Sequence, residues 1–380
     1  MSQEIERTLD LRNLLLKKSA FLFGPRQTGK TKLIKQQLGI YKYYNLLDRG
    51  LYLRLQKDPT LIRKELKKED KIIVIDEIQK IPELLDEVQL IIEEFGIHFL
   101  LTGSSARTLK SKGVNLLGGR ARERHLHPFI WNELQDEFHL LTALDRGLLP
   151  SIYFSDSPYE DLQSYCGQYL KEEVASEAKV RNIGAFSRFL EVAGLCNGQM
   201  INYTQIASDA QVPVSTTREY FQILYDTFLA VEVRAFNQTI KRKPISTSKF
   251  YFFDVGIARY LQERRGLSTK SPEFGEAFEH YIFHELSAFC SYTQKPPLQY
   301  WRSTSQFEVD FIFNKSVAIE VKAKGVINQR DMKSLKTLRE ENLLKRYIII
   351  SMIEDDYIDD GIEIYYWKSF LKKLWNSEFS

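Results

Sequence analysis

The sequence has little cysteine, little net charge and no long apolar run, and each shortage excludes a class of protein. Three cysteines among 380 residues, with no pair spaced as C-x-x-C, provide neither a disulfide framework nor a thiolate zinc site. No uninterrupted run of roughly 18 apolar residues occurs, so the sequence predicts neither a membrane span nor a signal peptide. Together these features favour a protein of the reducing cytoplasm.

The charge balance is only weakly basic. Lys and Arg number 53 against 50 Asp and Glu, a formal net charge of +3. A balance this even gives no support for nucleic-acid binding, so such support has to come from local clusters. The hydrophobic share of 43% and the charged share of 27% are ordinary for a globular protein. A length of 380 residues predicts two or three domains.

Short apolar runs alternate with amphipathic stretches between residues 20 and 103. Runs such as KIIVID and IHFLLTG are typical of strands covered on both faces, and helical patterns such as ELLDEVQLIIEEF separate them. This alternation predicts a parallel α/β sheet. Pro, Ser and Asp gather at residues 150–158, so we place the end of a first domain, 1–155, near this point.

The segment GPRQTGKT matches G-x-x-x-x-G-K-[ST] and lies between an apolar run and a helical pattern. Its glycines allow backbone N–H groups to point at phosphate oxygens, and the start of the following helix attracts anions. Lys30 is expected to contact the β- and γ-phosphates of ATP, and Thr31 to bind Mg²⁺. The expected nucleotide-binding residues are Gly24, Pro25, Arg26, Gln27, Thr28, Gly29, Lys30 and Thr31.

An acidic pair, Asp76 and Glu77, ends the apolar run KIIVID. Parallel strands bring their carboxyl ends to one crevice, so Asp76 is expected to share Mg²⁺ with Thr31, and Glu77 to polarise the attacking water. The next run, IHFLLTG, is followed by Ser104 and Ser105. Either serine, with Ser104 preferred, can sense the γ-phosphate or align the water, although serine after glycine is also common in turns.

Three arginines, Arg120, Arg122 and Arg124, lie in what we interpret as a glycine-flanked loop. A guanidinium aimed at the transferred phosphoryl group can accelerate hydrolysis by ~10³ to 10⁵, and a neighbouring subunit of a homo-oligomer can provide it. Arg120 is the candidate for this role. A solvated basic loop is the equally weighted alternative.

The middle of the chain, residues 160–260, is mostly helical. TQIASDA, a turn with Val212 and Pro213, and STTREYFQILYDTFL together predict a helix-turn-helix, followed by strands that would form a wing. Between residues 234 and 249 the basic residues Arg234, Lys241, Arg242, Lys243 and Lys249 occur without any acid. Such a cluster favours contacts with a DNA backbone. Winged helices also bind proteins, and that alternative stays open.

The last third, residues 265–380, returns to mixed α/β patterns. FEVDFIF and VAIEVKAK both alternate apolar and polar residues and are joined by a short link, which predicts a β-hairpin. Pairing of their polar faces would place Asp310 near Glu320, with Lys322 two residues further on. Neighbouring carboxylates repel unless a proton or a cation separates them, and Mg²⁺ prefers oxygen ligands. Lys322 would then orient or activate a water that attacks a phosphodiester. A solvated hairpin with alternating charge is the structural alternative.

These motifs together resemble one family. GPRQTGKT, VIDEIQ, LLTGSS, GGRARER and HPFIWNEL are similar to bacterial and archaeal AAA+ ATPases that carry a restriction-endonuclease-like C-terminal domain. The resemblance continues through SKFYFFDVGIARYL, FGEAFEHYIFHEL, YWRS, FEVDFIF and AIEVKAK, so it extends over nearly the whole chain. It implies a P-loop AAA+ parallel-sheet ATPase domain, then a winged-helix segment and a restriction-endonuclease-like α/β domain.

The resemblance also adds residues to the second site. Its D…E-x-K signature includes a further carboxylate from a preceding helix, which Glu279 matches by its place in GEAFE, with Glu285 as second choice. The possible second site is therefore Glu279, Asp310, Glu320 and Lys322. His280 and His284 have the i, i+4 spacing of a metal pair, but HYIFH is not H-E-x-x-H, and we interpret them as surface or second-shell residues.

Two functional hypotheses follow from different classes. The first is a Mg²⁺-ATP-dependent AAA+ ATPase whose nucleotide state controls a C-terminal module that binds DNA and, in its stronger version, cuts it. The second is a regulatory ATPase switch whose nuclease-like domain is inactive and binds a protein partner. A helicase-like motor is disfavoured because the chain is too short for a second motor domain beside its C-terminal elements.

Overall fold

The computed structural model describes residues 5–39, 41–111, 117–174, 180 and 182–379. The chain divides into two compact units. Unit 1 comprises residues 1–128 and 226–229, and unit 2 comprises residues 129–225 and 230–380. None of the helices in the described ranges combines the length and the apolar character needed to cross a bilayer.

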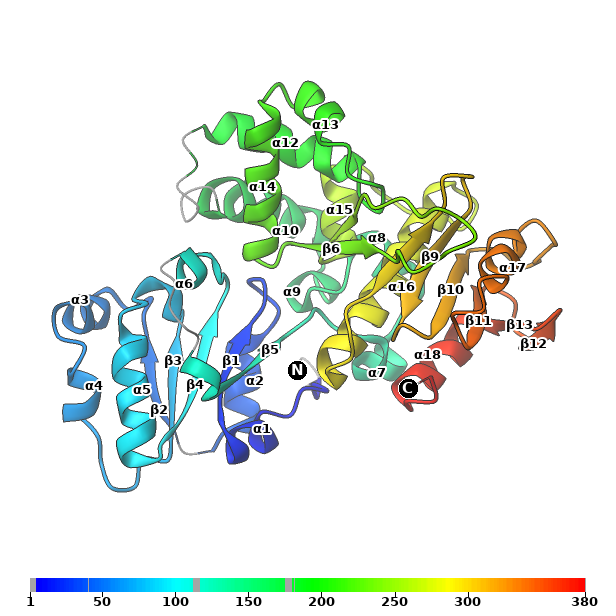
Figure 1. Ribbon diagram of the computed structural model, residues 1–380. Coiled ribbons are helices and arrows are strands. Elements are labelled where there is room, and N and C mark those ends of the chain that lie inside the picture. Colours follow the sequence, from blue (N-terminus) through cyan, green and yellow to red (C-terminus); the bar gives the residue numbers. More distant parts are fainter. Residues whose placement is uncertain (1–4, 40, 112–116, 175–179, 181, 380) are drawn as a thin grey trace. The chain divides into compact units, whose positions relative to one another are not determined.

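Unit 1 contains a five-stranded parallel sheet with the strand order β2-β3-β4-β1-β5 (Figure 1). The strands are β1 (Ser19–Phe23), β2 (Lys42–Asn45), β3 (Ile72–Asp76), β4 (His98–Gly103) and β5 (Ala121–His125). The three central strands are almost entirely buried, as unbroken apolar runs predict. The parallel α/β sheet expected from the sequence is confirmed.

Helices and short helical turns connect these strands. They are α1 (Leu11–Lys17), α2 (Lys30–Gln37), α3 (Arg49–Lys57), α4 (Leu61–Lys64), η1 (Ile78–Lys80), α5 (Leu84–Phe95), α6 (Arg107–Ser111) and η2 (Leu117–Gly119). Helix α5 buries Leu84, Leu85, Val88 and Ile91 in the main core of the unit, which explains their helical spacing. The helix ends at Gly96, whose left-handed backbone suits a C-terminal cap.

The N-terminal half of unit 2 is helical. Its elements are α7 (Trp131–Leu134), η3 (Gln135–Glu137), α8 (Leu140–Arg146), α9 (Pro150–Tyr153), α10 (Pro158–Ser164), η4 (Tyr165–Val174), α12 (Ile183–Leu195), α13 (Tyr203–Asp209), α14 (Val214–Asp226) and α15 (Val255–Leu261). The predicted pair TQIASDA and STTREYFQILYDTFL corresponds to α13 and α14. Two antiparallel strands, β6 (Ala230–Ala235) and β7 (Lys249–Phe252), follow α14.

The C-terminal half of unit 2 contains a mixed sheet with the order β12-β13-β11-β10-β9-β8-β6-β7. Its remaining elements are α16 (Glu273–Thr293), β8 (Gln299–Arg302), β9 (Glu308–Phe313), β10 (Val317–Lys322), α17 (Lys333–Arg339), β11 (Arg346–Ser351), β12 (Tyr357–Asp359), β13 (Ile362–Tyr366) and α18 (Trp367–Trp375). Strands β9 and β10 form the predicted antiparallel hairpin. Strand β6 joins β8, so the two strands after α14 belong to this sheet.

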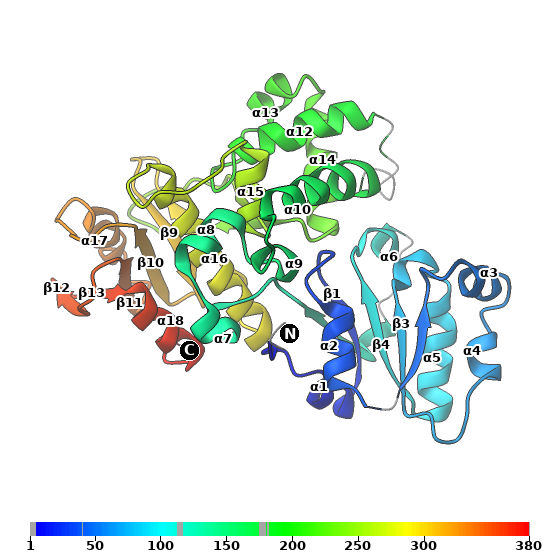
Figure 2. The ribbon, with the colours of Figure 1, turned by 180° about the vertical axis from the view of Figure 1, so that it is seen from behind.

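Helix α16 is the central helix of unit 2. It contacts β10, and Figures 1 and 2 show it against one face of the sheet from opposite directions. Buried residues occur on all of its sides, including Phe278, Tyr281 and Leu286. A helix that is apolar all round lies in the interior of a domain. Its few polar residues therefore need partners or a function.

The two compact units do not coincide with the three expected domains, whose bounds stay predictions. Residues 129–155 were assigned to the first domain, but they belong to unit 2. The reason is a set of buried contacts: the Phe129 N–H donates to the Leu148 carbonyl, and the Leu148 N–H donates to Asp254, which begins α15. The predicted boundary between residues 260 and 265 also lies inside unit 2, because β6 and β7 complete the C-terminal sheet.

Candidate functional site

The phosphate loop joins β1 to α2, and its shape depends on two glycines. Gly24 has φ +148°, and a Cβ there would lie 2.5 Å from the Leu126 carbonyl oxygen. Gly29 precedes α2 with φ +94°, a conformation that other residues adopt at a cost. Thr28 is fully buried and its hydroxyl donates to the Pro25 carbonyl at 2.9 Å. Arg26 is half-buried, whereas Gln27 and Thr31 are exposed.

Lys30 points back into the phosphate loop. Its Nζ donates to the carbonyl oxygens of Gly24 at 2.7 Å and Pro25 at 2.9 Å. Burial lowers the pKa of Lys30 to about 8, against the opposing effect of the Glu77 and Asp76 carboxylates. The ammonium group therefore lies between the loop and the acidic pair, and its two carbonyl contacts can be exchanged for phosphate oxygens.

The acidic pair lies at the carboxyl end of β3 and is buried. Asp76 accepts hydrogen bonds from the Thr102 hydroxyl of β4 and, at 2.5 Å, from the Tyr43 hydroxyl of β2. Both contacts leave lone pairs on the carboxylate for a cation. Glu77 has φ +62° and ψ +46°, a left-handed backbone that is uncommon for a residue with a side chain and is concentrated at functional sites.

The two serines that follow β4 have different surroundings. Ser104 is buried, and its Oγ donates to Glu77 Oε2 at 3.1 Å. Ser105 Oγ accepts the Arg107 N–H at 3.1 Å, close to the start of α6. Of the two candidates, the structure brings only Ser104 into contact with Glu77. The side chains of Lys30, Asp76, Glu77 and Ser104 thus gather at the carboxyl ends of β1, β3 and β4.

Arg120 does not lie with the residues at the carboxyl ends of the strands. The segment interpreted as a loop contains β5, whose first residue Ala121 pairs with Ser19 at the start of β1. Because the strands are parallel, Arg120 lies at the amino edge of the sheet, and the phosphate loop follows the carboxyl edge. Arg120 Nη2 forms an ion pair with Glu93 at 2.6 Å. The structure therefore does not bring Arg120 to the phosphate loop of its own chain.

A second group of charged side chains lies in unit 2, where β9 and β10 pair. We call Glu279, Glu308, Asp310, Glu320, Lys249 and Lys322 the carboxylate cluster. The register Ile319↔Phe311 places Glu320 opposite Asp310, as the alternation predicted. Asp310 accepts the Val321 N–H at 2.7 Å, and Lys322 Nζ forms an ion pair with Glu320 at 2.5 Å.

Burial and mutual repulsion act on the carboxylates of this cluster. Burial, and then the charge of Asp310, raise the pKa of Glu320 well above its usual value. The same two causes raise the pKa of Glu279 to about 7. Glu320 Oε2 is buried without a hydrogen-bond partner among the described residues. Arg302 also pairs with Glu308 at 2.8 Å, so four carboxylates face three cations, and the remaining excess of negative charge would be relieved by a proton or a further cation.

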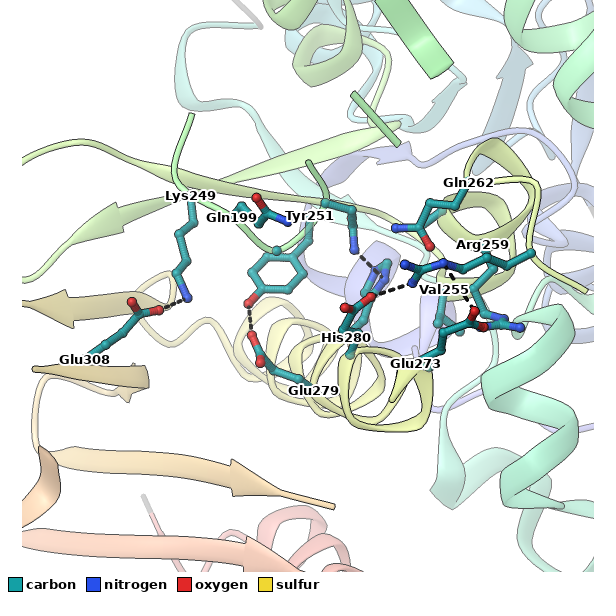
Figure 3. Close-up of a pocket in the computed structure, with 16 residues that line it drawn as sticks. Gln199, Lys249, Tyr251, Val255, Arg259, Gln262, Glu273, Glu279, His280 and Glu308 are labelled. Atoms are coloured by element: carbon teal, nitrogen blue, oxygen red, sulfur yellow. Dashed lines mark hydrogen bonds and ion pairs between the residues drawn. The ribbon is translucent and has the colours of Figure 1, made fainter. Parts of the chain in front are cut away.

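Strand β7 contributes Lys249 to the cluster and places Tyr251 against it, and neither role was expected from the sequence (Figure 3). Lys249 is buried and pairs with Glu308, and the Tyr251 hydroxyl donates to Glu279 at 2.6 Å. They border a cavity of about 270 Å³ that Arg259 and His280 also line. Neither could be identified in advance, because β7 is separated in sequence from the hairpin.

His280, His284 and the second-choice carboxylate Glu285 have structural roles. His280 and His284 are buried rather than on the surface, and each lies within hydrogen-bond distance of a backbone carbonyl, that of Phe252 and Phe129 respectively. Burial lowers the pKa of His280 to about 3, so it is neutral. Glu285 accepts from the Trp131 N–H at 2.7 Å and from Trp375 Nε1 at 2.9 Å, which excludes it as the cluster's helix carboxylate. Within the described ranges, no three His, Cys, Asp or Glu residues form a metal-ligand group.

The basic segment between residues 234 and 249 is largely neutralised. The Glu341 carboxylate accepts the N–H groups of Ile240, Lys241 and Arg242 at 2.9–3.0 Å, and Arg242 forms an ion pair with Glu340 at 2.7 Å. Arg234 pairs with Glu232 and Lys249 with Glu308. Acids outside the segment, some of them distant in sequence, thus pair with part of its basic residues, and contact of the segment with DNA stays a prediction.

Comparisons with known proteins divide the chain into three parts. Residues 16–135 match the family model described as an AAA domain, residues 138–270 match a domain of unknown function (DUF8612), and residues 274–370 match a domain of unknown function (DUF4143). The topology of unit 1 and the first match together show that the N-terminal part has a P-loop AAA+ fold, as predicted. The two unknown-function matches leave the winged-helix and restriction-endonuclease-like assignments as predictions.

Individual relatives are distant. Uncharacterized proteins of Mycobacterium bovis and Mycobacterium tuberculosis are each 25% identical over 304 residues, covering 76% of this chain and 66% of the relative. The chain thus spans just under two thirds of their length.

The Aeropyrum pernix ORC1 protein in complex with DNA aligns at 15% identity and a TM-score of 0.28, covering 69% of this chain and 94% of that one. The replication initiator DnaA bound to AMPPCP and single-stranded DNA aligns at 11% identity and a TM-score of 0.30, covering 58% and 90%. Both structural similarities are too weak to support statements about this chain.

Proposed function

We propose that the chain is an ATPase that binds Mg²⁺-ATP at the phosphate loop and hydrolyses it. The observation that supports this most strongly is the convergence of Lys30, Asp76, Glu77 and Ser104, from three different connections, at one edge of the parallel sheet. A glycine turn between a strand and a helix does not require a buried lysine facing two carboxylates. The AAA domain match over residues 16–135 supports the same conclusion.

The roles follow from the chemistry of phosphoryl transfer. The loop amides from Gly24 to Thr31 would hold the phosphates, and Lys30 would exchange its carbonyl contacts for the β- and γ-phosphate oxygens. Thr31 and Asp76 offer the hydroxyl and carboxylate oxygens that Mg²⁺ prefers. When bound, Mg²⁺ neutralises charge that develops on the phosphate oxygens. Glu77 would take a proton from the attacking water, and Ser104 keeps the Glu77 carboxylate in place.

The test separates binding from turnover. Lys30→Ala is expected to abolish ATP binding and hydrolysis, whereas Glu77→Gln should still bind ATP but turn it over ~10²- to 10⁴-fold more slowly. Lys35→Ala, an exposed lysine of the same helix α2, is the matched control and should behave as wild type. ATP turnover and fluorescent-nucleotide binding are measured for all four proteins. Undiminished turnover in Lys30→Ala would refute the proposal that ATP is hydrolysed at this phosphate loop.

A second proposed activity, metal-dependent cleavage of DNA, concerns the carboxylate cluster. It is supported by the excess negative charge there, by the unpartnered Glu320 Oε2, and by the placement of Lys322 beside Glu320. The order α16-β8-β9-β10-α17-β11, with two successive antiparallel pairs followed by a parallel pair, is consistent with the restriction-endonuclease-like fold. Glu279, Asp310 and Glu320 do not form a three-ligand group as they stand, so their side chains would have to move together to hold Mg²⁺. The bound Mg²⁺ would activate water, and Lys322 would orient that water.

DNA cleavage is tested on linear, nicked and branched DNA with Mg²⁺ and Mn²⁺, with and without ATP. Asp310→Asn and Lys322→Ala should abolish any cleavage, and Glu285→Gln is the control because this carboxylate of α16 holds two tryptophans instead. A dependence of cleavage on ATP would support control by the nucleotide state. An inert wild-type protein, with ATP turnover insensitive to DNA, favours the alternative: a regulatory ATPase switch whose C-terminal domain binds a protein partner.

A further inference from the structure

Gln79 lies beside Glu77 and contacts the proposed hydrolytic site directly. It belongs to the short helical turn η1 and is 6% exposed. Its Nε2 donates to Glu77 Oε2 at 2.5 Å and lies 3.3 Å from Ser104 Oγ. Ser104 donates to the same carboxylate oxygen, so Gln79, Ser104 and Glu77 form a closed triangle.

The orientation of the Gln79 amide follows from its neighbours. Only the nitrogen can donate to a carboxylate, and an amide oxygen placed there would repel it. The oxygen must therefore point away from Glu77. In that position Oε1 is buried and has no hydrogen-bond partner among the described residues. A buried acceptor without a partner costs free energy. The bond from Nε2 to Glu77 therefore holds the amide in an orientation that leaves its oxygen without a hydrogen bond.

Gly103 makes room for this oxygen. A Cβ on Gly103 would lie 2.7 Å from Gln79 Oε1 and 3.3 Å from the Phe23 ring. The end of β4 therefore fits the amide only because residue 103 has no side chain.

Gln37 of the same unit shows what a structural amide looks like. Its Oε1 accepts the Leu11 N–H at 2.7 Å, and its Nε2 donates to the Leu9 carbonyl at 2.8 Å. Both of its polar groups are used in connecting the segment before α1 to α2. Gln79 differs in that its donor is used and its acceptor is not.

We propose that Gln79 is a positioning residue for ATP hydrolysis, whose nitrogen, together with the Ser104 hydroxyl, fixes the direction of the Glu77 carboxylate. This inference rests on the proposed ATPase function. In the reaction, the water oxygen bonds to the γ-phosphorus, and the bond from the γ-phosphorus to the bridging oxygen breaks with its electron pair left on ADP. The water proton passes to Glu77 and then to the released phosphate. Gln79 itself neither gains nor loses a proton.

Gln79→Leu removes both hydrogen-bonding groups at similar volume. The expected result is a loss of ~10²-fold in kcat with the KM for ATP changed less than ~3-fold, because the Glu77 carboxylate loses its fixed direction and the phosphate contacts do not change. Gln37→Leu is the control and should leave kcat unchanged while lowering the melting temperature. A merely structural role of Gln79 would instead lower nucleotide affinity and stability together.

A double variant tests the proposed geometry without relying on Gln79→Leu. Gly103→Ala should reduce kcat by displacing the amide, but should have a smaller further effect in a Gln79→Ala background, where the clash with Oε1 is absent and only the 3.3 Å contact with the Phe23 ring remains. Unchanged kcat in Gln79→Leu, or fully additive losses in the double variant, would overturn the inference while wild-type turnover leaves the ATPase proposal standing. A wild-type protein without turnover would overturn both.

Discussion

The Tyr43 hydroxyl donates to Asp76 Oδ2 at 2.5 Å, and so couples an edge strand of the ATPase sheet to the predicted magnesium ligand. Burial raises the pKa of Tyr43, and the hydrogen bond to Asp76 adds to the shift, so the phenol remains a proton donor at any working pH. Together with the Thr102 hydroxyl, Tyr43 fixes the direction in which the Asp76 carboxylate points.

Tyr43→Phe is therefore expected to weaken Mg²⁺ use without preventing it. A freed carboxylate samples more orientations, and outer hydrogen-bond partners of metal ligands typically contribute 10- to 100-fold in affinity or activity. We expect the Mg²⁺ concentration for half-maximal turnover to rise by roughly 10-fold, with ATP turnover at saturating Mg²⁺ close to wild type. Tyr41→Phe, altered on a neighbouring tyrosine, is the control. An unchanged Mg²⁺ requirement would mean that Thr102 alone orients Asp76.

Tyr43 also illustrates what the sequence could predict about unit 1. Strands β1, β3 and β4 were recognisable because each is an unbroken apolar run, and the phosphate loop because it is a local motif. Strands β2 and β5 were missed, since KYYN and ARERH are half-exposed edge strands that lack an apolar pattern and form only by pairing with a neighbour. Residues contributed by such strands, including Tyr43, were missed with them.

In unit 2 as well, the sequence predicts contacts within a local hairpin but not contacts between residues that are distant in sequence. The alternation in β9 and β10 was sufficient to place Asp310 opposite Glu320, because a hairpin is local. Lys249 and Tyr251 reach the cluster from β7, and no local pattern relates them to the hairpin. The acids that contact the basic segment show the same limit, since Glu341 lies 99 residues after Arg242 in sequence and only the fold brings them together.

The contact between Glu341 and residues 240–242 predicts how the chain responds to salt. Since Arg242 is paired with Glu340 and Lys241 also contacts the Glu340 carbonyl, wild-type association with duplex DNA should depend only weakly on salt. Replacing Glu340 and Glu341 by Gln should expose two cations and steepen the slope of log K against log[salt] by roughly 2.

The measurement is fluorescence anisotropy of a labelled duplex between 50 and 200 mM salt. Adding Lys241→Ala and Arg242→Ala to the Glu340→Gln/Glu341→Gln variant should restore the shallow slope. A steep wild-type slope that these two alanines abolish would show that the segment already contacts phosphates.

Arg120 remains a candidate for action on a neighbouring subunit, because the ion pair with Glu93 leaves it 39% exposed. If it acts in trans, Arg120→Ala should lower kcat by ~10³-fold or more without affecting ATP binding. Mixing Arg120→Ala with Lys30→Ala subunits should then restore part of the activity, since the second variant supplies the arginine and the first supplies the nucleotide site.

Glu93→Ala separates this role from a structural one. Loss of Glu93 frees Arg120, so a trans arginine would keep its activity. If the ion pair is what matters, Glu93→Ala and Arg120→Ala should have equal effects on stability and turnover, and mixed subunits should show no recovery.

Asp254 gives unit 2 a defined pH dependence. Its buried carboxylate accepts the Leu148 N–H at 2.7 Å and the Gly256 N–H at 2.9 Å, and so connects the start of α15 to the loop after α8. The loop passes so close that a Cβ on Gly147 would lie 2.0 Å from Asp254 Oδ1. Burial raises the pKa of Asp254 to about 6, although its backbone donors oppose the shift.

The direction in which stability changes with pH follows from proton linkage. Between the unfolded value near 3.9 and the folded value near 6, the native state holds more protons, so the free energy of unfolding falls as pH rises through this window and is level above about pH 7. A pKa difference of about 2 between the folded and unfolded states corresponds to at most ~3 kcal/mol in the free energy of unfolding. Asp254→Asn removes this titration. The wild-type stability minus that of the variant should therefore fall from pH 4.5 to pH 6.5 and then remain constant.

Urea unfolding followed by tryptophan fluorescence measures this difference, because all four tryptophans of the sequence lie in unit 2. Asp161→Asn, a change at an exposed carboxylate of α10, should give a pH-independent difference from wild type. A stability difference for Asp254→Asn that grows with rising pH would mean that the backbone N–H donors outweigh burial, and that Asp254 is ionised in the native state throughout the range.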